Sequence, residues 1–396
     1  MELYAPVLHI PEAVNFDCTG CGNCCFTWPV PATAADVDRI TALSNADQVP
    51  RFKKFAQKSD DKLRGFTHFL GKDERGDCQY LDNLRCSLHA KHGSHAKPAM
   101  CQLFPYTFTL TPTGAYASLS FASTGVLLNH GTPLSQQRAF LEDRLALFLC
   151  LFPGEPDWSR IQLIDGIALT WIDYLLIERK LLATLHPNNS TANGDDLVSC
   201  SAQILGSTRV DLEHEKMIKA PPPFMDTVFT LLLMEMYFPD NAFNDNVCNF
   251  DTTKLVKLLS NQSSLPKFQF DRRQFDLQEL SGIKVGGISK EADELLGRFM
   301  YCRIFAKLYF GPGFNGLSLL SGFHHLFLLS ALCRLRLKMR ICCGSKEDEL
   351  MDCLREDLRL MERRLTVTSL SQEAQAAMEV LLQGPQRTKR IVMAAS

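Results

Sequence analysis

The sequence has little net charge and lacks a long, uninterrupted apolar run. Its 42 lysines and arginines are balanced by 44 aspartates and glutamates, so no overall field attracts nucleic acid or an anionic membrane. We therefore expect no nucleic-acid partner. A long apolar stretch without charge, residues 308–333, is broken by glycine, proline, asparagine and two histidines. A buried core helix after a glycine-rich loop fits this pattern better than a membrane span does.

The N-terminus also lacks the pattern of a secretory signal. Glu2 stands where such a signal carries basic residues, and Pro6 and Pro11 interrupt any apolar segment. This favours a cytoplasmic location. In that reducing compartment the 15 cysteines are expected to be metal ligands or small buried hydrophobic residues, because disulfides are rare there.

Cysteine is concentrated in the first third of the chain. Four thiols lie within CTGCGNCC, residues 18–25, and three more follow within the length of one small domain. Thiolates at this spacing can converge on one centre, whereas four idle thiols so close together are chemically hazardous. Gly20 and Gly22 support a ligand loop, because glycine tolerates positive φ cheaply. We predict that seven thiols gather around metal: Cys18, Cys21, Cys24, Cys25, Cys78, Cys86 and Cys101.

The spacing leaves two kinds of metal centre open. Cys18, Cys21 and Cys24 have the C-x2-C-x2-C spacing of three ligands of a 4Fe-4S iron–sulfur cluster, whose fourth ligand commonly precedes a proline. Cys101 matches that position only loosely, since the next proline is Pro105. The run CTGCG equally resembles a zinc knuckle that a later cysteine completes. We place an iron–sulfur cluster ahead of zinc.

Seven thiols do not divide into sites of four. His89 is the candidate that would complete a second site; otherwise the spare thiols are structural or open to a substrate. His92 and His95 are less suited as metal ligands, because Gly93 interrupts the three histidines at 89, 92 and 95 and because surface histidines are common. The remaining cysteines lie in apolar helical contexts and are expected to be buried core thiols: Cys150, Cys200, Cys248, Cys302, Cys333, Cys342, Cys343 and Cys353.

Hydrophobic periodicity predicts a mainly α protein with two domains. Residues 1–130 are expected to form a small α+β metal-binding domain with short hairpins. A helix should begin after Thr33. One hairpin, residues 76–86, should turn at Asp82-Asn83 and carry a cysteine on each strand. A second should turn at 111–114.

Residues 131–396 are expected to form an all-helical domain, since the apolar pattern changes to a helical period near residue 135. Within it, His324 and His325 are expected to be a satisfied core pair. The predicted helices include Gln137–Phe152, Ser159–Leu185, Phe224–Phe238, Ser289–Phe310, Ser345–Leu365 and Ser371–Leu382.

Five motifs together resemble the YkgJ-type cysteine-cluster family, bacterial proteins described as zinc- or iron-chelating. The resemblance covers roughly residues 15–130, and the long form looks like the branch that includes the flagellin lysine-N-methylases. The motifs are CTGCGNCC, the helix start Thr33–Ile40, Cys78-Gln-Tyr-Leu, Cys86-Ser-Leu-His89 and Lys97-Pro98-x-x-Cys101-x-x-Phe104-Pro105.

The resemblance implies a ligand set and an alternative activity. The family's ligands fall on the same seven cysteines, whereas many long-form relatives carry a further cysteine about where this chain has residues 121–124, FAST. The branch implies an S-adenosylmethionine-dependent protein lysine N-methyltransferase with a protein substrate. The sequence shows no glycine-rich strand-to-helix loop of the usual nucleotide-binding type, and it indicates no catalytic residues. A structural zinc module that serves as an interaction platform is a third hypothesis.

Overall fold

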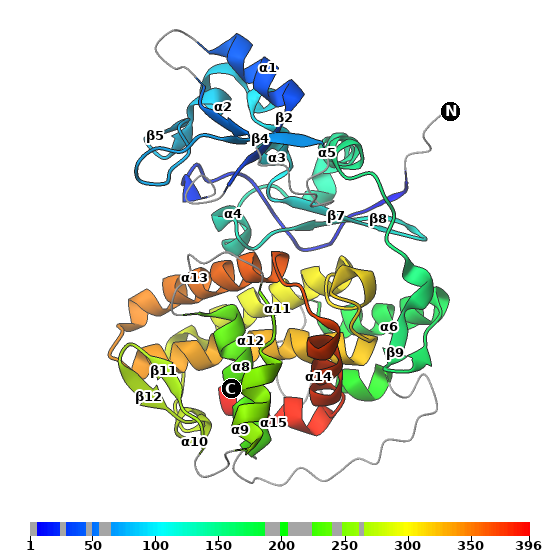
Figure 1. The fold of residues 1–396 in the computed structure, drawn as a ribbon, viewed down its shortest axis with the longest axis vertical. Coiled ribbons are helices and arrows are strands. Elements are labelled where there is room, and N and C mark those ends of the chain that lie inside the picture. The colour runs from blue at the N-terminus through cyan, green and yellow to red at the C-terminus, as the bar shows by residue number, and fades with distance from the viewer. Residues whose placement is uncertain are drawn as a thin grey trace. The chain divides into compact units, whose positions relative to one another are not determined.

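The computed structural model divides into two compact units, Met1–Glu155 and Pro156–Ser396 (Figure 1). Its described part is mainly helical with small sheets of short strands, which confirms the predicted fold class. The domain boundary at residue 130 stays a prediction. The structure describes residues 6–23, 29–44, 50–54, 65–186, 199–204, 224–239, 248–260 and 265–396.

One sheet of the first unit is built on a hairpin. Strands β7 (Tyr106–Thr111) and β8 (Gly114–Leu119) pair antiparallel, which confirms the predicted hairpin at 111–114. β1 (Leu8–His9) adds to β8 in parallel. Helix α5 (Arg138–Leu151), predicted as 137–152, packs against β7, where the rings of Phe108 and Phe148 lie 5.6 Å apart. This helix therefore belongs to the first unit.

A second antiparallel sheet has the order β2-β4-β3. Its strands are β2 (Pro31–Thr33), β4 (Phe66–Leu70) and β3 (Phe52–Lys54). Helix α1 (Ala34–Leu43) follows β2 directly. The predicted capping box is present at its start, with Thr33 as the N-cap and Asp36 as its partner.

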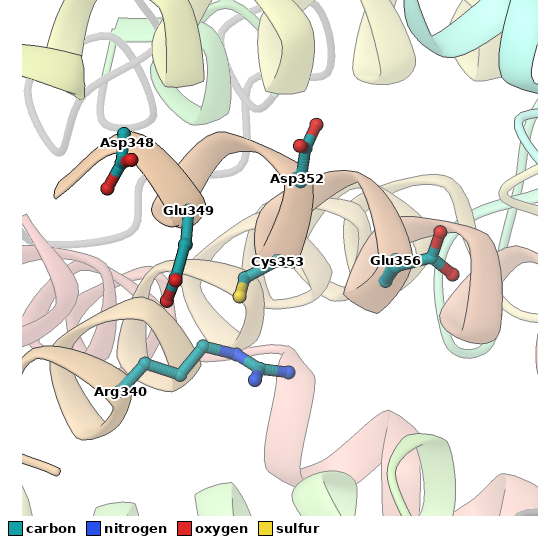
Figure 2. Close-up of a pocket in the computed structure, with 6 residues that line it drawn as sticks. All are labelled: Arg340, Asp348, Glu349, Asp352, Cys353 and Glu356. Atoms are coloured by element: carbon teal, nitrogen blue, oxygen red, sulfur yellow. The ribbon is translucent and has the colours of Figure 1, made fainter. Parts of the chain in front are cut away.

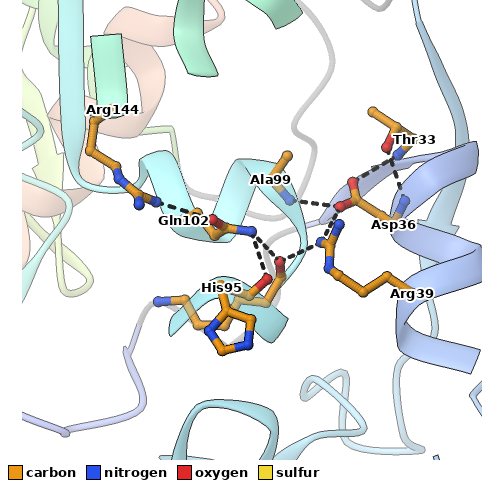
Figure 3. Close-up of polar contacts among 8 residues, drawn as sticks. Thr33, Asp36, Arg39, His95, Ala99, Gln102 and Arg144 are labelled. Atoms are coloured by element: carbon orange, nitrogen blue, oxygen red, sulfur yellow. Dashed lines mark hydrogen bonds and ion pairs between the residues drawn. The ribbon is translucent and has the colours of Figure 1, made fainter. Parts of the chain in front are cut away.

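Asp36 also joins α1 to the helix that carries Cys101 (Figure 3). Its carboxylate is buried and accepts hydrogen bonds from the backbone N–H of Thr33 at 3.0 Å and of Ala99 at 3.1 Å. Arg39 adds an ion pair at 2.5 Å. Ala99 is the first residue of α3 (Ala99–Leu103). A buried carboxylate with several donors fixes geometry well, so α1 sets the position of α3.

The hairpin predicted at 76–86 is present but differs in detail from its prediction. Strands β5 (Leu81–Asp82) and β6 (Arg85–Cys86) are only two residues long. The turn lies at Asn83-Leu84 rather than at the predicted Asp82-Asn83. Asn83 and Leu84 adopt φ of +46° and +63°, the left-handed pair that a tight hairpin turn requires. Cys86 lies on β6, but Cys78 precedes β5 and forms an isolated bridge with Lys72. Helix α2 (Ser87–His92) follows.

The second unit is organised around α12 (Leu319–Cys342), a 24-residue helix that is buried along most of its length. Every residue from Leu319 to Cys333 is buried, so this part of α12 is covered on all sides, as expected of a central helix. No helix among the described residues has the length and apolarity needed to cross a membrane. Helices that contact α12 include α8 (Phe224–Tyr237), α11 (Ser289–Phe305), α13 (Glu347–Thr366), α14 (Gln372–Leu382) and α15 (Pro385–Ala395).

The predicted helix Ser159–Leu185 is wrong in its first part. A 3-10 turn (Trp158–Arg160) and a hairpin of β9 (Gln162–Ile164) and β10 (Ile167–Ala168) precede α6 (Trp171–Thr184). Gly166 has a φ of +81°, which the hairpin turn needs, and Thr170 caps α6 by accepting from the Asp173 N–H.

The second unit is thus not all-helical. A further hairpin, β11 (Phe268–Phe270) and β12 (Arg273–Phe275), lies between α9 (Thr252–Ser260) and α10 (Leu277–Ser281). Helix α11 also ends five residues before the predicted Phe310, because Lys307 takes a left-handed φ of +57° that no α-helix accommodates.

His324 and His325 of α12 are confirmed as a satisfied core pair. His324 contacts the Ser201 hydroxyl at 2.8 Å and the Leu382 carbonyl at 2.5 Å, and His325 contacts the Tyr237 hydroxyl at 2.9 Å. Both rings are buried. Burial lowers the pKa of His324 to about 4 and that of His325 to about 3, so both rings are neutral at pH 7.

This burial makes the stability of the second unit sensitive to acid. The unfolded chain binds protons at histidine near the ordinary pKa, whereas the folded unit does not until the pH is far lower. Stability is therefore complete above about pH 6.5 and falls as the pH drops, by up to ~1.4 kcal/mol per pH unit for each histidine. His325→Gln should lower this slope. Urea unfolding followed by fluorescence of Trp158 and Trp171 measures it, and an unchanged slope would contradict the account.

Candidate metal centre

The segment that leads into the first cysteine is held by residues 130–132. The Phe16 N–H donates to the Thr132 carbonyl at 3.0 Å, and the Asp17 N–H donates to the His130 carbonyl at 2.7 Å. The Asp17 carboxylate accepts from the Thr132 N–H and hydroxyl at 2.8 and 2.9 Å. A Cβ at Gly131 would lie 2.4 Å from Asp17. The approach requires glycine and fixes the chain directly before Cys18.

The cysteine loop then lies against the β5–β6 hairpin. Gly22 has a φ of +72°, and a Cβ there would lie 3.0 Å from the Leu84 carbonyl oxygen and 3.1 Å from Leu81 Cδ1. Gly20 has a φ of +66° and faces Arg85 with more room, 3.9 Å. The expectation that both glycines adopt positive φ is confirmed. The loop with Cys18 and Cys21 is thereby held beside the hairpin that ends in Cys86.

A third contact joins the loop to α4 (Thr124–Leu127). The Cys21 thiol donates to the Thr124 hydroxyl oxygen at 3.2 Å, and the Asn23 side-chain N–H donates to the same oxygen at 3.0 Å. The sequence alone does not indicate Thr124 as a site residue. Thr124 lies in residues 121–124, FAST, where the family resemblance leads one to expect a further cysteine and gives no sign of a hydrogen-bonding residue.

The three later cysteines lie around one apolar cluster. Cys78 is a buried member of this cluster, and the partly buried Cys86 and Cys101 pack against it. The other buried members are Val30, Ile40, Leu70, Tyr80 and Leu88. Segments far apart in the sequence therefore place these three thiols at a shared core, which limits their motion.

The described thiols form two groups. Cys18, which is exposed, and Cys21 lie on the loop, while Cys78, Cys86 and Cys101 lie at the apolar cluster. Cys24 and Cys25 lie outside the described residues. Within the described ranges, no three histidine, cysteine, aspartate or glutamate side chains are placed to hold a metal ion. The thiol donors themselves suit zinc or an iron–sulfur cluster by their softness.

His89 stands on the first turn of α2, three residues after Cys86. Its ring is largely exposed. Partial burial, and then the positive charge of Lys97, lower its pKa, which favours the neutral imidazole that a metal requires. His92 ends the same helix, and His95 uses its backbone carbonyl to accept from Gln102 at 3.1 Å (Figure 3).

A protonated tyrosine lies near the start of the loop. Tyr106 packs edge-on against Phe16 with ring centres 5.5 Å apart. Burial, and then the negative charge of Asp17, raise the pKa of Tyr106 well above its usual range. Its hydroxyl is therefore neutral near pH 7.

The remaining cysteines only partly match their prediction as buried core thiols. Cys200, Cys248, Cys302 and Cys333 are buried, and burial raises the pKa of Cys302 to about 12. Cys150, in the last turn of α5, is exposed, which contradicts the prediction. Helix periodicity points it away from the packed face. Three more lie only partly buried near the α12–α13 turn: Cys342, Cys343 and Cys353.

A pocket also lies on α13 in the second unit (Figure 2). Its lining is mostly acidic, and Figure 2 shows Glu349 and Cys353 pointing towards Arg340. Arg340 is already paired with the buried carboxylate of Asp357 at 2.9 Å. The pocket therefore has the character of a solvated acidic face, and none of the five described candidate cysteines lines it.

The close approach of Gly22 generates a prediction with a matched control. Gly20→Ala should cost ~1 kcal/mol because an alanine is placed in the left-handed region. Gly22→Ala should cost about 1–3 kcal/mol more, because its Cβ would press on the hairpin backbone. Urea unfolding of both variants tests the difference. Equal losses would contradict the tight packing of the loop against the hairpin.

Comparison with known proteins gives one result for this region. Residues 17–123 match the family described as CxxCxxCC, putative zinc- or iron-chelating domain. The comparisons with curated proteins and with solved structures give no match. The matched range contains the loop, the β5–β6 hairpin, α3 and the apolar cluster with its three cysteines. Residues 17–123 of this chain are thus similar to the CxxCxxCC cysteine-cluster family.

Proposed function

We propose that the first unit binds metal through cysteine thiolates, as an iron–sulfur cluster or as zinc, in a cytoplasmic protein. The observation that carries the proposal is the packing of the cysteine loop against the hairpin that ends in Cys86, next to the core that holds Cys78 and Cys101. The proposed ligands are Cys18, Cys21, Cys24, Cys25, Cys78, Cys86 and Cys101.

The architecture of the first unit supports a role for bound metal in its stability. Its strands are two to six residues long, and its second sheet rests on a small apolar cluster. Short strands with a limited core gain much from a cross-link between distant segments. A thiolate-bound metal would supply such a cross-link, and an iron–sulfur cluster would in addition exchange electrons.

The chain's own residues prepare the site for this role. Asp17, Gly22 and Asp36 fix the loop and α3 through contacts within the protein. Ligands on fixed elements lose less conformational entropy on binding than ligands on free chains do. Metal binding also displaces the thiol protons to solvent, so uptake should weaken as the pH falls.

Metal content tests the proposal directly. Full-length protein purified without oxygen should contain iron with inorganic sulfide and a broad visible absorbance, or colourless zinc. Cys21→Ser should weaken metal retention by more than ~10-fold, because loss of a direct ligand exceeds the usual effect of losing an outer partner. The exposed Cys150 in α5 offers a matched control, and Cys150→Ser should retain the wild-type content.

Two outcomes would contradict the proposal. Wild-type protein that holds neither iron nor zinc after anaerobic purification and reconstitution would exclude a metal centre in this unit. Equal metal retention in Cys21→Ser and Cys150→Ser would exclude the loop as its site. Folding of each variant is checked by circular dichroism, so that loss of metal is not mistaken for general unfolding.

The lysine methyltransferase and interaction-platform alternatives stay predictions. The first requires specific binding of S-adenosylmethionine, which calorimetry on metal-loaded full-length protein detects. The second requires that loss of a loop cysteine unfolds the first unit. Both alternatives are compatible with metal binding, and they differ in the role that the metal centre would have.

A further inference from the structure

Two hydrogen bonds join the side chains of Asn23, Thr124 and Cys21, with the Thr124 hydroxyl in the middle. The Asn23 amide N–H donates to the Thr124 hydroxyl oxygen at 3.0 Å, and the Cys21 thiol lies 3.2 Å from that same oxygen. A hydroxyl has one proton to donate and two lone pairs that accept. The oxygen therefore keeps the Asn23 bond whether it accepts from Cys21 or donates to it.

From this order we infer that Thr124 is a positioning residue that donates a hydrogen bond to the Cys21 thiolate when Cys21 is a metal ligand. The inference rests on the proposed metal-binding function. On binding, the Cys21 S–H bond breaks, its proton leaves to solvent and a sulfur–metal bond forms. The thiolate can then only accept, so the Cys21–Thr124 contact persists with the Thr124 hydroxyl as the donor.

The fold holds this contact at a fixed distance. A Cβ at Gly125, the residue after Thr124, would lie 2.6 Å from the backbone oxygen of Asp17. Asp17 is itself bound to Thr132 by two hydrogen bonds. The start of α4 and the cysteine loop are thus joined on both sides of Cys21, and the hydroxyl cannot move away from the sulfur without breaking these contacts.

The donor role suits Thr124 better than the role of a ligand. A neutral hydroxyl binds zinc or iron poorly beside thiolates, which are the softer and charged donors. One of its two lone pairs already accepts the hydrogen bond from Asn23. Hydrogen bonds to a ligand sulfur fix its orientation and draw electron density from it, and such outer partners tune metal affinity and reduction potential.

Cobalt(II) added to full-length, reduced, metal-free protein is the probe. Cobalt bound by thiolates shows a sulfur-to-metal charge-transfer band, whose energy falls when a hydrogen bond to the sulfur is lost. Thr124→Val keeps the size and branching of the side chain but removes the donor. Its band should move to longer wavelength, and zinc affinity in chelator competition should fall about 10-fold.

Two further variants make the result specific. Thr124→Ser keeps the hydroxyl and should restore the wild-type band and affinity, which a merely structural role of the methyl group would not. Thr107→Val is the matched control, because the Thr107 hydroxyl in β7 is buried and has no hydrogen-bond partner in the described part of the chain. It should leave the band unchanged.

The outcomes separate this inference from the proposed function. A wild-type protein that takes up neither cobalt nor zinc overturns both. A normal wild-type band that is unchanged in Thr124→Val, or changed equally in Thr124→Ser, overturns the role of Thr124 alone. Thermal melts of the metal-free variants identify misfolding. A Thr124→Val protein that is folded before cobalt is added, and that shows the shifted band after cobalt is added, supports the inference.

Discussion

The close approach of the cysteine loop to its two neighbours is the constraint on which the first unit depends. On one side the Asp17 carboxylate and backbone are bound to residues 130–132. On the other side Gly22 leaves no room for a side chain against Leu84. The Asp17–Thr132 contact joins positions 115 residues apart in the sequence, and the contact of Gly22 also joins distant segments. Together these contacts close the unit around its thiols. The loop is thus shaped by protein contacts, and metal would be bound by ligands that are already restricted.

In the second unit, polar and charged side chains are buried in the core and paired with one another. Its central helix α12 contains polar groups that find partners inside the core. The Glu379 carboxylate accepts from the backbone and side chain of Ser318 at 2.6 and 2.8 Å, near the start of α12. The buried Lys307 pairs with Glu178 at 2.9 Å. Paired in this way, buried charges fix one arrangement of helices at a modest cost in stability. The second unit is thus a packed core with paired polar groups, whereas the chemistry proposed for the protein lies with the thiols of the first unit.

The sequence predicted those helices and turns that depend on a few adjacent residues. The capping box at Thr33 and the turn at Gly114 are present because they depend on a few adjacent residues. The first part of the helix predicted at 159–185 failed because Gly166 and the cap at Thr170 override a helical apolar period. The seven candidate cysteines could be named from spacing, whereas Thr124 could not, since its role arises only when α4 meets the loop.

X-ray absorption at the metal edge of full-length protein tests the central claim most directly, because it reports which atoms surround the metal. A shell of sulfur at about 2.3 Å is expected for thiolate ligation of zinc or of an iron–sulfur cluster. A second shell of neighbouring iron would identify the cluster. A first shell made only of nitrogen and oxygen at about 2.0–2.2 Å would contradict the account, because the cysteines would then not be the ligands.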